Sequence, residues 1–214
     1  MNKLSVTRSL LASGTISGPL FILGVLVQSN INPGFDLRTD LISLLSIGQF
    51  GYLQITNFAL CGVLNLLFAV GVWRILHGGP AGTFAPIFIA LHGLLLVVVA
   101  VFVTDPSNGF PPQSVAPPVP TTHGIIHAGA ALWVFLTCAA ALAVFVRHFL
   151  ADGERWWAAY SGGSAVLMLA VFFASFVARP VAPILDLSLV IGWMGISAVA
   201  LKLFSAPFRG QARS

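Results

Sequence analysis

Residues 85–104 read APIFIALHGLLLVVVAVFVT, a run of twenty residues without Asp, Glu, Lys or Arg. A helix of this length crosses the hydrocarbon core of a bilayer, which is about 30 Å thick. The whole chain has the same character, because 57% of its 214 residues are hydrophobic and only 7% are charged. Soluble domains carry about 25% charged residues. The composition therefore excludes a soluble enzyme and a nucleic-acid-binding protein, and it places most of the surface against lipid.

Six apolar runs of this kind follow one another along the chain. They are continuous, whereas the strands of a membrane β-barrel alternate between apolar and polar residues. We therefore predict an all-α fold, a single membrane domain over residues 1–214 with six transmembrane helices. The first run is long and no small-residue cleavage site follows it, which favours an uncleaved signal anchor. The predicted spans are about 9–29, 50–74, 85–104, 123–148, 157–178 and 181–204.

Basic residues are distributed unequally between the two sides of this bundle. With six spans, both termini share one side with the loops between spans two and three and between spans four and five. Only Arg38 and Arg179 lie on the other side. Because basic residues stay in the cytoplasm, both termini are predicted to be cytoplasmic and the protein to lie in the inner (plasma) membrane. The bases on the predicted cytoplasmic side are Lys3, Arg8, Arg74, Arg147, Arg155, Lys202, Arg209 and Arg213.

Acidic residues gather on the opposite side. Acids contribute little to membrane topology, so their position carries separate information. It indicates that binding or chemistry takes place at the extracytoplasmic face. The acids at or just inside the outer ends of the spans are Asp36, Asp40, Asp105 and Asp186.

The connection between the first two spans, residues 30–49, contains leucines at a spacing of three to four residues. This spacing predicts a short amphipathic helix at the membrane interface. Asp36, Asp40 and Ser43 would share one face of that helix. The face either points to solvent or covers the top of the bundle.

The loop after the third span, residues 105–122, holds six of the thirteen prolines. A segment of this composition is semi-rigid and extended rather than helical. It is either a lid over the bundle or an exposed loop. A lid would require apolar contacts from Phe110 or Val115.

Two histidines begin the fourth span. We expect Thr122 to cap the helix, so that His123 and His127 lie one turn apart on one helical face. The helix N-terminus disfavours imidazolium, and neutral imidazole is the form that binds zinc. Asp105 and Asp186 would supply carboxylates to this outer Asp/His site, which makes zinc a possible cofactor. Alternatively, the two histidines simply bond to loop carbonyls or to ordered water.

Other polar residues lie deeper in the spans. Gln54 and Asn57 are three residues apart, and amides at this depth often join neighbouring helices by hydrogen bonds. His92 lies within the third span, too far from the outer cluster to join it. We expect a satisfied interior histidine there, with a step in a proton relay as the alternative.

A set of polar residues, glycines and aromatic residues forms a pattern between the first connection and the fourth span. Its members are Asp40, Ser43, Gly48, Gly51-Tyr52-Leu53-Gln54, Asn57-Phe58, Asp105-Pro106, His123-Gly124 and His127. This pattern resembles a widespread prokaryotic family of six-helix membrane proteins that is known only as a domain of unknown function. The resemblance covers nearly the whole chain. It implies six spans and brings no activity with it.

The Ser, Asp and HxxxH set is also similar, more weakly, to the membrane metal-hydrolase superfamily of alkaline ceramidases and adiponectin-type receptors. That similarity implies that His123, His127 and Asp105 hold zinc, with Ser43 and Asp40 near the activated water. The chain departs from the superfamily in three respects. It has six spans instead of seven, its histidines lie in span four instead of the last span, and no third histidine reaches the cluster.

Three functions are consistent with these observations. The first is metal-assisted hydrolysis of a lipid at the outer face. The second is a non-catalytic lipid-binding, sensory or assembly role, with membrane lipids or a small molecule as the ligand. The third is a small proton-coupled transporter that uses Asp186 and His92. Whether the protein is an enzyme is left open by the sequence.

Overall fold

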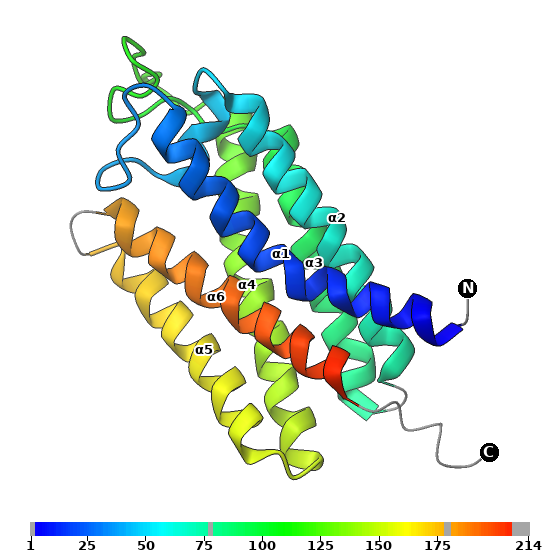
Figure 1. Cartoon of the computed structure of the whole chain (residues 1–214). Coiled ribbons are helices and arrows are strands. Elements are labelled where there is room, and N and C mark those ends of the chain that lie inside the picture. The colour runs from blue at the N-terminus through cyan, green and yellow to red at the C-terminus, as the bar shows by residue number, and fades with distance from the viewer. Residues whose placement is uncertain (1–2, 77–78, 178–180, 207–214) are drawn as a thin grey trace.

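The computed structural model describes residues 3–76, 79–177 and 181–206, and helices dominate these residues (Figure 1). No strand forms within these three ranges, so the predicted all-α fold is confirmed. The elements are α1 (Lys3–Ile31), the 3-10 helix η1 (Ile42–Ile47), α2 (Gly51–Ile75), α3 (Gly79–Val101), α4 (Thr122–Ala151), α5 (Arg155–Ala174) and α6 (Val181–Ser205).

Each of the six α-helices is long and apolar enough to cross a membrane. The predicted number of spans is therefore confirmed, and the chain is a multi-pass membrane protein. The first helix begins at Lys3 instead of residue 9, and the fifth ends at Ala174. Residue 178, Arg179, Arg209 and Arg213 lie outside the described residues. The orientation of the termini and the identity of the membrane stay predictions.

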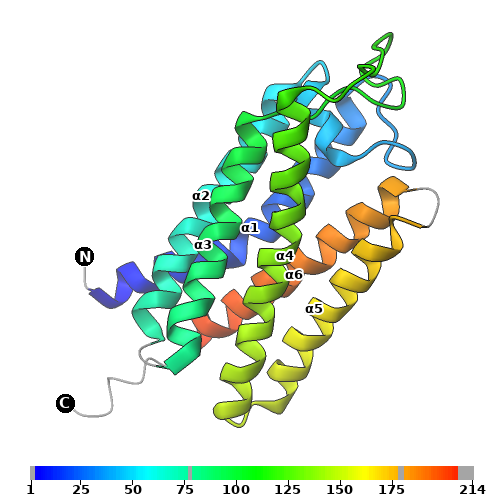
Figure 2. The ribbon, with the colours of Figure 1, turned by 180° about the vertical axis from the view of Figure 1, so that it is seen from behind.

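The helices form a closed ring in which each packs against the next and α6 packs against α1 (Figures 1 and 2). Helix η1 packs against α2 and α1 at one end of the ring, which we call the η1 end. The beginning of α1 and the end of α6 lie toward the opposite end (Figure 1). Buried apolar side chains form one cluster around Phe21, Phe58 and Trp193 and a second around Phe68 and Phe145.

Helices α2 and α3 cross at two glycines. A Cβ atom added to Gly62 would lie 2.7 Å from the carbonyl oxygen of Gly93, and a Cβ atom added to Gly93 would lie 2.7 Å from the carbonyl oxygen of Gly62. Any side chain at either position would therefore press against backbone, which cannot move aside without separating the helices. Small residues at such crossings let membrane helices pack closely.

The short helix predicted between the first two spans is present, but it is a 3-10 helix limited to residues 42–47. Its side chains Ile42, Leu44 and Leu45 are buried against the bundle. Before this helix, Asp40 Oδ2 accepts a hydrogen bond from the backbone N–H of Asp36 at 2.9 Å. This local side-chain bond favours a turn over a helix. The predicted shared face of Asp36, Asp40 and Ser43 is therefore wrong.

The proline-rich loop lies against the first connection. Phe110 is only 2% exposed and meets the ring of Phe35 edge-on at 5.4 Å between centroids. Asn108 Nδ2 donates to the carbonyl oxygen of Thr39 at 2.8 Å. Val115, in contrast, is 86% exposed. Phe110, one of the two residues either of which could anchor a lid, thus makes apolar contacts, and the loop covers the first connection.

Candidate functional site

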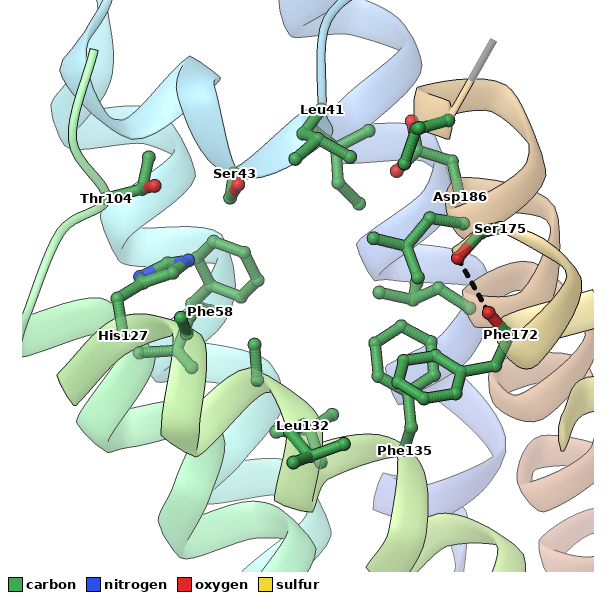
Figure 3. Close-up of a pocket in the computed structure, with 18 of the residues that line it drawn as sticks. Leu41, Ser43, Phe58, Thr104, His127, Leu132, Phe135, Phe172, Ser175 and Asp186 are labelled. Carbon is green, nitrogen blue, oxygen red and sulfur yellow. Dashed lines mark hydrogen bonds between the residues drawn. The ribbon is translucent and has the colours of Figure 1, made fainter. Parts of the chain in front are cut away.

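A cavity of about 410 Å³ lies inside the helix ring at the η1 end (Figure 3). Its volume falls in the range of about 300–1,000 Å³ that is typical of small-molecule sites. Residues from η1 and from all the α-helices except α1 contribute to its wall. Most of the wall is apolar, and large side chains in it include Leu41, Phe58, Leu132, Phe135, Phe172 and Phe176.

The cavity opens on the side of the bundle. Helices α4 and α5 are joined at the end opposite η1 and diverge toward the η1 end (Figure 2). Leu132 of α4 and Phe176, just after α5, line the cavity and are also 40% and 65% exposed. At the inner end, the rings of Phe135 and Phe172 meet with centroids 4.6 Å apart and form a floor (Figure 3). The cavity is therefore open to the lateral surface of the bundle between α4 and α5.

His127 lines one side of this cavity. Its side chain is only 4% exposed, and its Nδ1 lies 2.7 Å from the carbonyl oxygen of Phe102. Because a carbonyl only accepts, Nδ1 must carry the proton, which leaves Nε2 of the neutral ring as an acceptor. Helix α4 begins one residue earlier than predicted, since the Thr121 hydroxyl caps it by accepting from the Gly124 N–H at 3.1 Å.

Asp186 lies on the opposite side of the cavity from His127 (Figure 3). It is in the second turn of α6, and its carboxyl group interacts with the backbone of Ile42 in η1. Its Oδ2 atom is buried without a hydrogen-bond partner among the residues described. The hydroxyls of Ser43 and Thr104 complete the η1 end of the cavity. The structure thus brings together three predicted site residues, Ser43, His127 and Asp186.

The other predicted site residues lie outside this cavity. Asp105 accepts from Thr121 at both oxygens, from the backbone N–H at 2.9 Å and from the hydroxyl at 2.5 Å. Its negative charge therefore stabilises the N-terminus of α4. His123 is exposed and packs edge-on against Phe102, with ring centroids 5.2 Å apart. Asp40 accepts the hydrogen bond from the Asp36 N–H in the turn that precedes η1.

The predicted zinc ligands accordingly divide into two pairs. His127 and Asp186 line the cavity, whereas His123 and Asp105 lie at the start of α4. Across residues 3–76, 79–177 and 181–206, no group of three or more His, Cys, Asp and Glu side chains is placed to hold a metal. Zinc at this site stays a prediction.

Sequence reasoning missed two polar contributors and the aromatic floor. Thr104, which follows α3, and Ser175, the residue after α5, both line the cavity. Ser175 interrupts an apolar stretch near the end of its span, which was the one signal that pointed to it. Nothing in the sequence pairs Phe135 with Phe172, because they belong to different helices.

The deeper polar residues join helices. Gln54 Oε1 accepts from Gln28 Nε2 at 2.9 Å, and Asn57 Nδ2 donates to the carbonyl oxygen of Phe21 at 3.1 Å. The predicted interhelical role of Gln54 and Asn57 is confirmed, with α1 as the neighbouring helix. His92 Nδ1 lies 3.1 Å from the carbonyl oxygen of Val134. This contact agrees with a satisfied interior histidine, and the proton relay stays a prediction.

Fold and cavity together define a polytopic α-helical membrane protein with a ligand-sized cavity that opens on the side of the helix bundle. The chain belongs to the family described as "Protein of unknown function (DUF998)", which matches residues 15–202. The predicted resemblance to a family of unknown function is therefore confirmed over nearly the whole chain. No curated protein and no solved structure matched the chain. The similarity to the alkaline ceramidase superfamily stays a prediction.

Proposed function

We propose that this protein binds one amphiphilic molecule from the surrounding bilayer. The apolar part of the ligand occupies the cavity, and its polar head lies at the η1 end among Ser43, His127 and Asp186. The observation that carries the proposal is the cavity itself, which has apolar walls, a side opening and polar groups gathered at one end. Apolar pockets with a few convergent polar groups are typical ligand sites.

The polar end explains how such a site selects its ligand. A chain that moves from lipid into an apolar cavity gains little hydrophobic free energy, because lipid tails are as apolar as leucine. Preference over bulk lipid therefore depends on the fit against the Phe135–Phe172 floor and on hydrogen bonds at the head. If the predicted orientation is correct, the ligand comes from the outer leaflet.

Two matched substitutions in α4 test the binding. Ala131 is partly buried in the cavity wall, so Ala131→Phe places a ring in the ligand space. Gly129 is exposed, and an added Cβ meets no atom within 4 Å, so Gly129→Phe adds the same ring outside. Each protein is purified in mild detergent and analysed by native mass spectrometry and lipid extraction.

We expect wild type and Gly129→Phe to retain one amphiphile per chain and Ala131→Phe to lose most of it. Thermal unfolding of the three proteins shows whether each is folded. Equal retention by folded Ala131→Phe and Gly129→Phe would refute a ligand in this cavity.

Hydrolysis is a second candidate, because the Ser43 hydroxyl and the Nε2 acceptor of His127 border the same cavity. An acceptor nitrogen near a hydroxyl is the arrangement used in general-base catalysis. The same preparations are assayed against ester-linked and amide-linked lipids, and their zinc content is measured. Turnover that Ser43→Ala and His127→Gln both abolish would support the enzyme. The absence of turnover in a preparation that retains its amphiphile would support binding alone.

A further inference from the structure

We infer that the head group held in this cavity is a hydrogen-bond donor without negative charge, a hydroxyl or an ammonium group, and that Asp186 receives it. This inference rests on the proposed function and specifies its ligand. It follows from the hydrogen-bonding capacity that the η1 end of the cavity leaves unused.

The unused capacity consists mainly of acceptors. Asp186 Oδ2 is buried and has no partner in the described part of the chain. His127 offers only the lone pair of Nε2, since its Nδ1–H is bonded to Phe102. Ser175 donates its proton to the carbonyl oxygen of Phe172 at 2.6 Å, which leaves lone pairs on its hydroxyl. Ser43 and Thr104 can rotate to donate or to accept. A ligand must therefore bring the missing donors.

The charges around the cavity lead to the same conclusion. Asp186 is the acidic residue in its wall, and no Lys or Arg lines it within the described ranges. Arg179, between α5 and α6, lies outside those ranges. An anionic head would lie beside the Asp186 carboxyl group with no base in the described part of the wall to balance its charge, and burial of an unpaired anion is costly. An ammonium would be attracted, and a hydroxyl would satisfy the buried acceptor.

The position of Asp186 sets the direction of the ligand. Its carboxyl group contacts the backbone of Ile42, so the head lies directly beneath η1. The chain of the ligand then runs toward the floor formed by Phe135 and Phe172 (Figure 3). His127, on the opposite side, is placed to accept from a second donor of the same head.

Competition among amphiphiles with one common chain tests the inference. Wild-type protein in phosphatidylcholine nanodiscs is labelled with a diazirine-bearing long-chain alcohol, and the labelled peptides are identified. Hexadecanol, hexadecylamine and hexadecyl sulfate then compete with the label. We expect the alcohol and the amine to compete at least about tenfold better than the sulfate, which corresponds to one hydrogen bond to a charged group.

Asp186→Asn replaces the carboxylate by an amide of the same shape that also donates. We expect it to reduce the advantage of the amine over the sulfate by about tenfold to a hundredfold. Asp152→Asn is the matched control, because Asp152 follows α4 at the opposite end of the bundle. It should leave the order of the competitors unchanged.

The outcomes separate this inference from the proposed function. Labelling that Ala131→Phe abolishes, combined with a preference for the sulfate or with no effect of Asp186→Asn in a folded protein, overturns the inference alone. Labelling outside the cavity, or labelling unaffected by Ala131→Phe, overturns the proposed function as well.

Discussion

Replacement of Asp186 by leucine should stabilise the ligand-free protein. The carboxyl oxygen Oδ2 is buried without a partner among the described residues, and such an atom lowers stability by about 1–3 kcal/mol. The substitution also loses the contact with the Ile42 backbone, a hydrogen bond that contributes about 0.5–1.5 kcal/mol. Removal of the unsatisfied atom outweighs that loss, which leaves a net gain of about 1 kcal/mol.

The assay is thermal unfolding of delipidated protein in one detergent. For a chain of this length, about 1 kcal/mol corresponds to a rise in Tm of about 2–4 °C. The matched control is Asp105→Leu, because both oxygens of Asp105 accept hydrogen bonds from Thr121. Its removal loses two exposed hydrogen bonds to a charged group at the helix terminus and should lower stability by about 1–3 kcal/mol.

Added ligand should reverse the comparison at Asp186. We expect hexadecanol to bind the folded wild type and to raise its Tm by mass action, whereas Asp186→Leu lacks the acceptor and should gain little. A gain in stability together with a loss of ligand response is the behaviour of a residue retained for binding. If Asp186→Leu destabilised the protein as strongly as Asp105→Leu, Asp186 would be a structural residue and our reasoning would be refuted.

Three further predictions test other parts of the structure by the same unfolding assay. Thr121→Ala removes the cap of α4 and should lower stability by about 1 kcal/mol; a change near zero would argue against the cap. His127→Ala leaves the Phe102 carbonyl without its donor and should lower stability by about 1–3 kcal/mol, whereas exposed His123→Ala should change it by less than about 0.5 kcal/mol. Equal effects of the two would contradict the assignment of His127 to the buried bond. Gly93→Leu forces a side chain against the α2 backbone and should lower stability by at least about 1–3 kcal/mol, and an unchanged Tm would show that α2 and α3 do not cross there.

The helices were predictable because their signal is local. The run at residues 85–104 needs no tertiary information, since its length and composition alone match a membrane span. The first connection was not predictable in the same way. Its leucine spacing indicated an amphipathic helix, but Asp40 bonds to the Asp36 N–H and ends the regular pattern. A side-chain hydrogen bond that competes with helix formation depends on the rotamer of one residue, and it does not appear in the periodicity of the sequence.

The candidate site was predictable in part. His127 was identified by its spacing from His123, and Asp186 by its position near the outer end of its span. Both were grouped with His123 and Asp105 in one outer site, and the structure separates those two. His123 is one turn nearer to the helix terminus, where the wall of the cavity has ended, and Asp105 is bonded to Thr121. The cavity itself results from the divergence of α4 and α5, which no single segment of sequence encodes.

For the proposed ligand, the side opening between α4 and α5 determines which concentration controls its occupancy of the cavity. A molecule that enters there never passes through water, so the relevant concentration is its mole fraction in the leaflet rather than its molarity in the medium. Dilution with buffer leaves such a complex intact, whereas added lipid or detergent depletes it. Encounter is then a search in two dimensions, and the occupancy of the cavity reports the composition of the membrane around it.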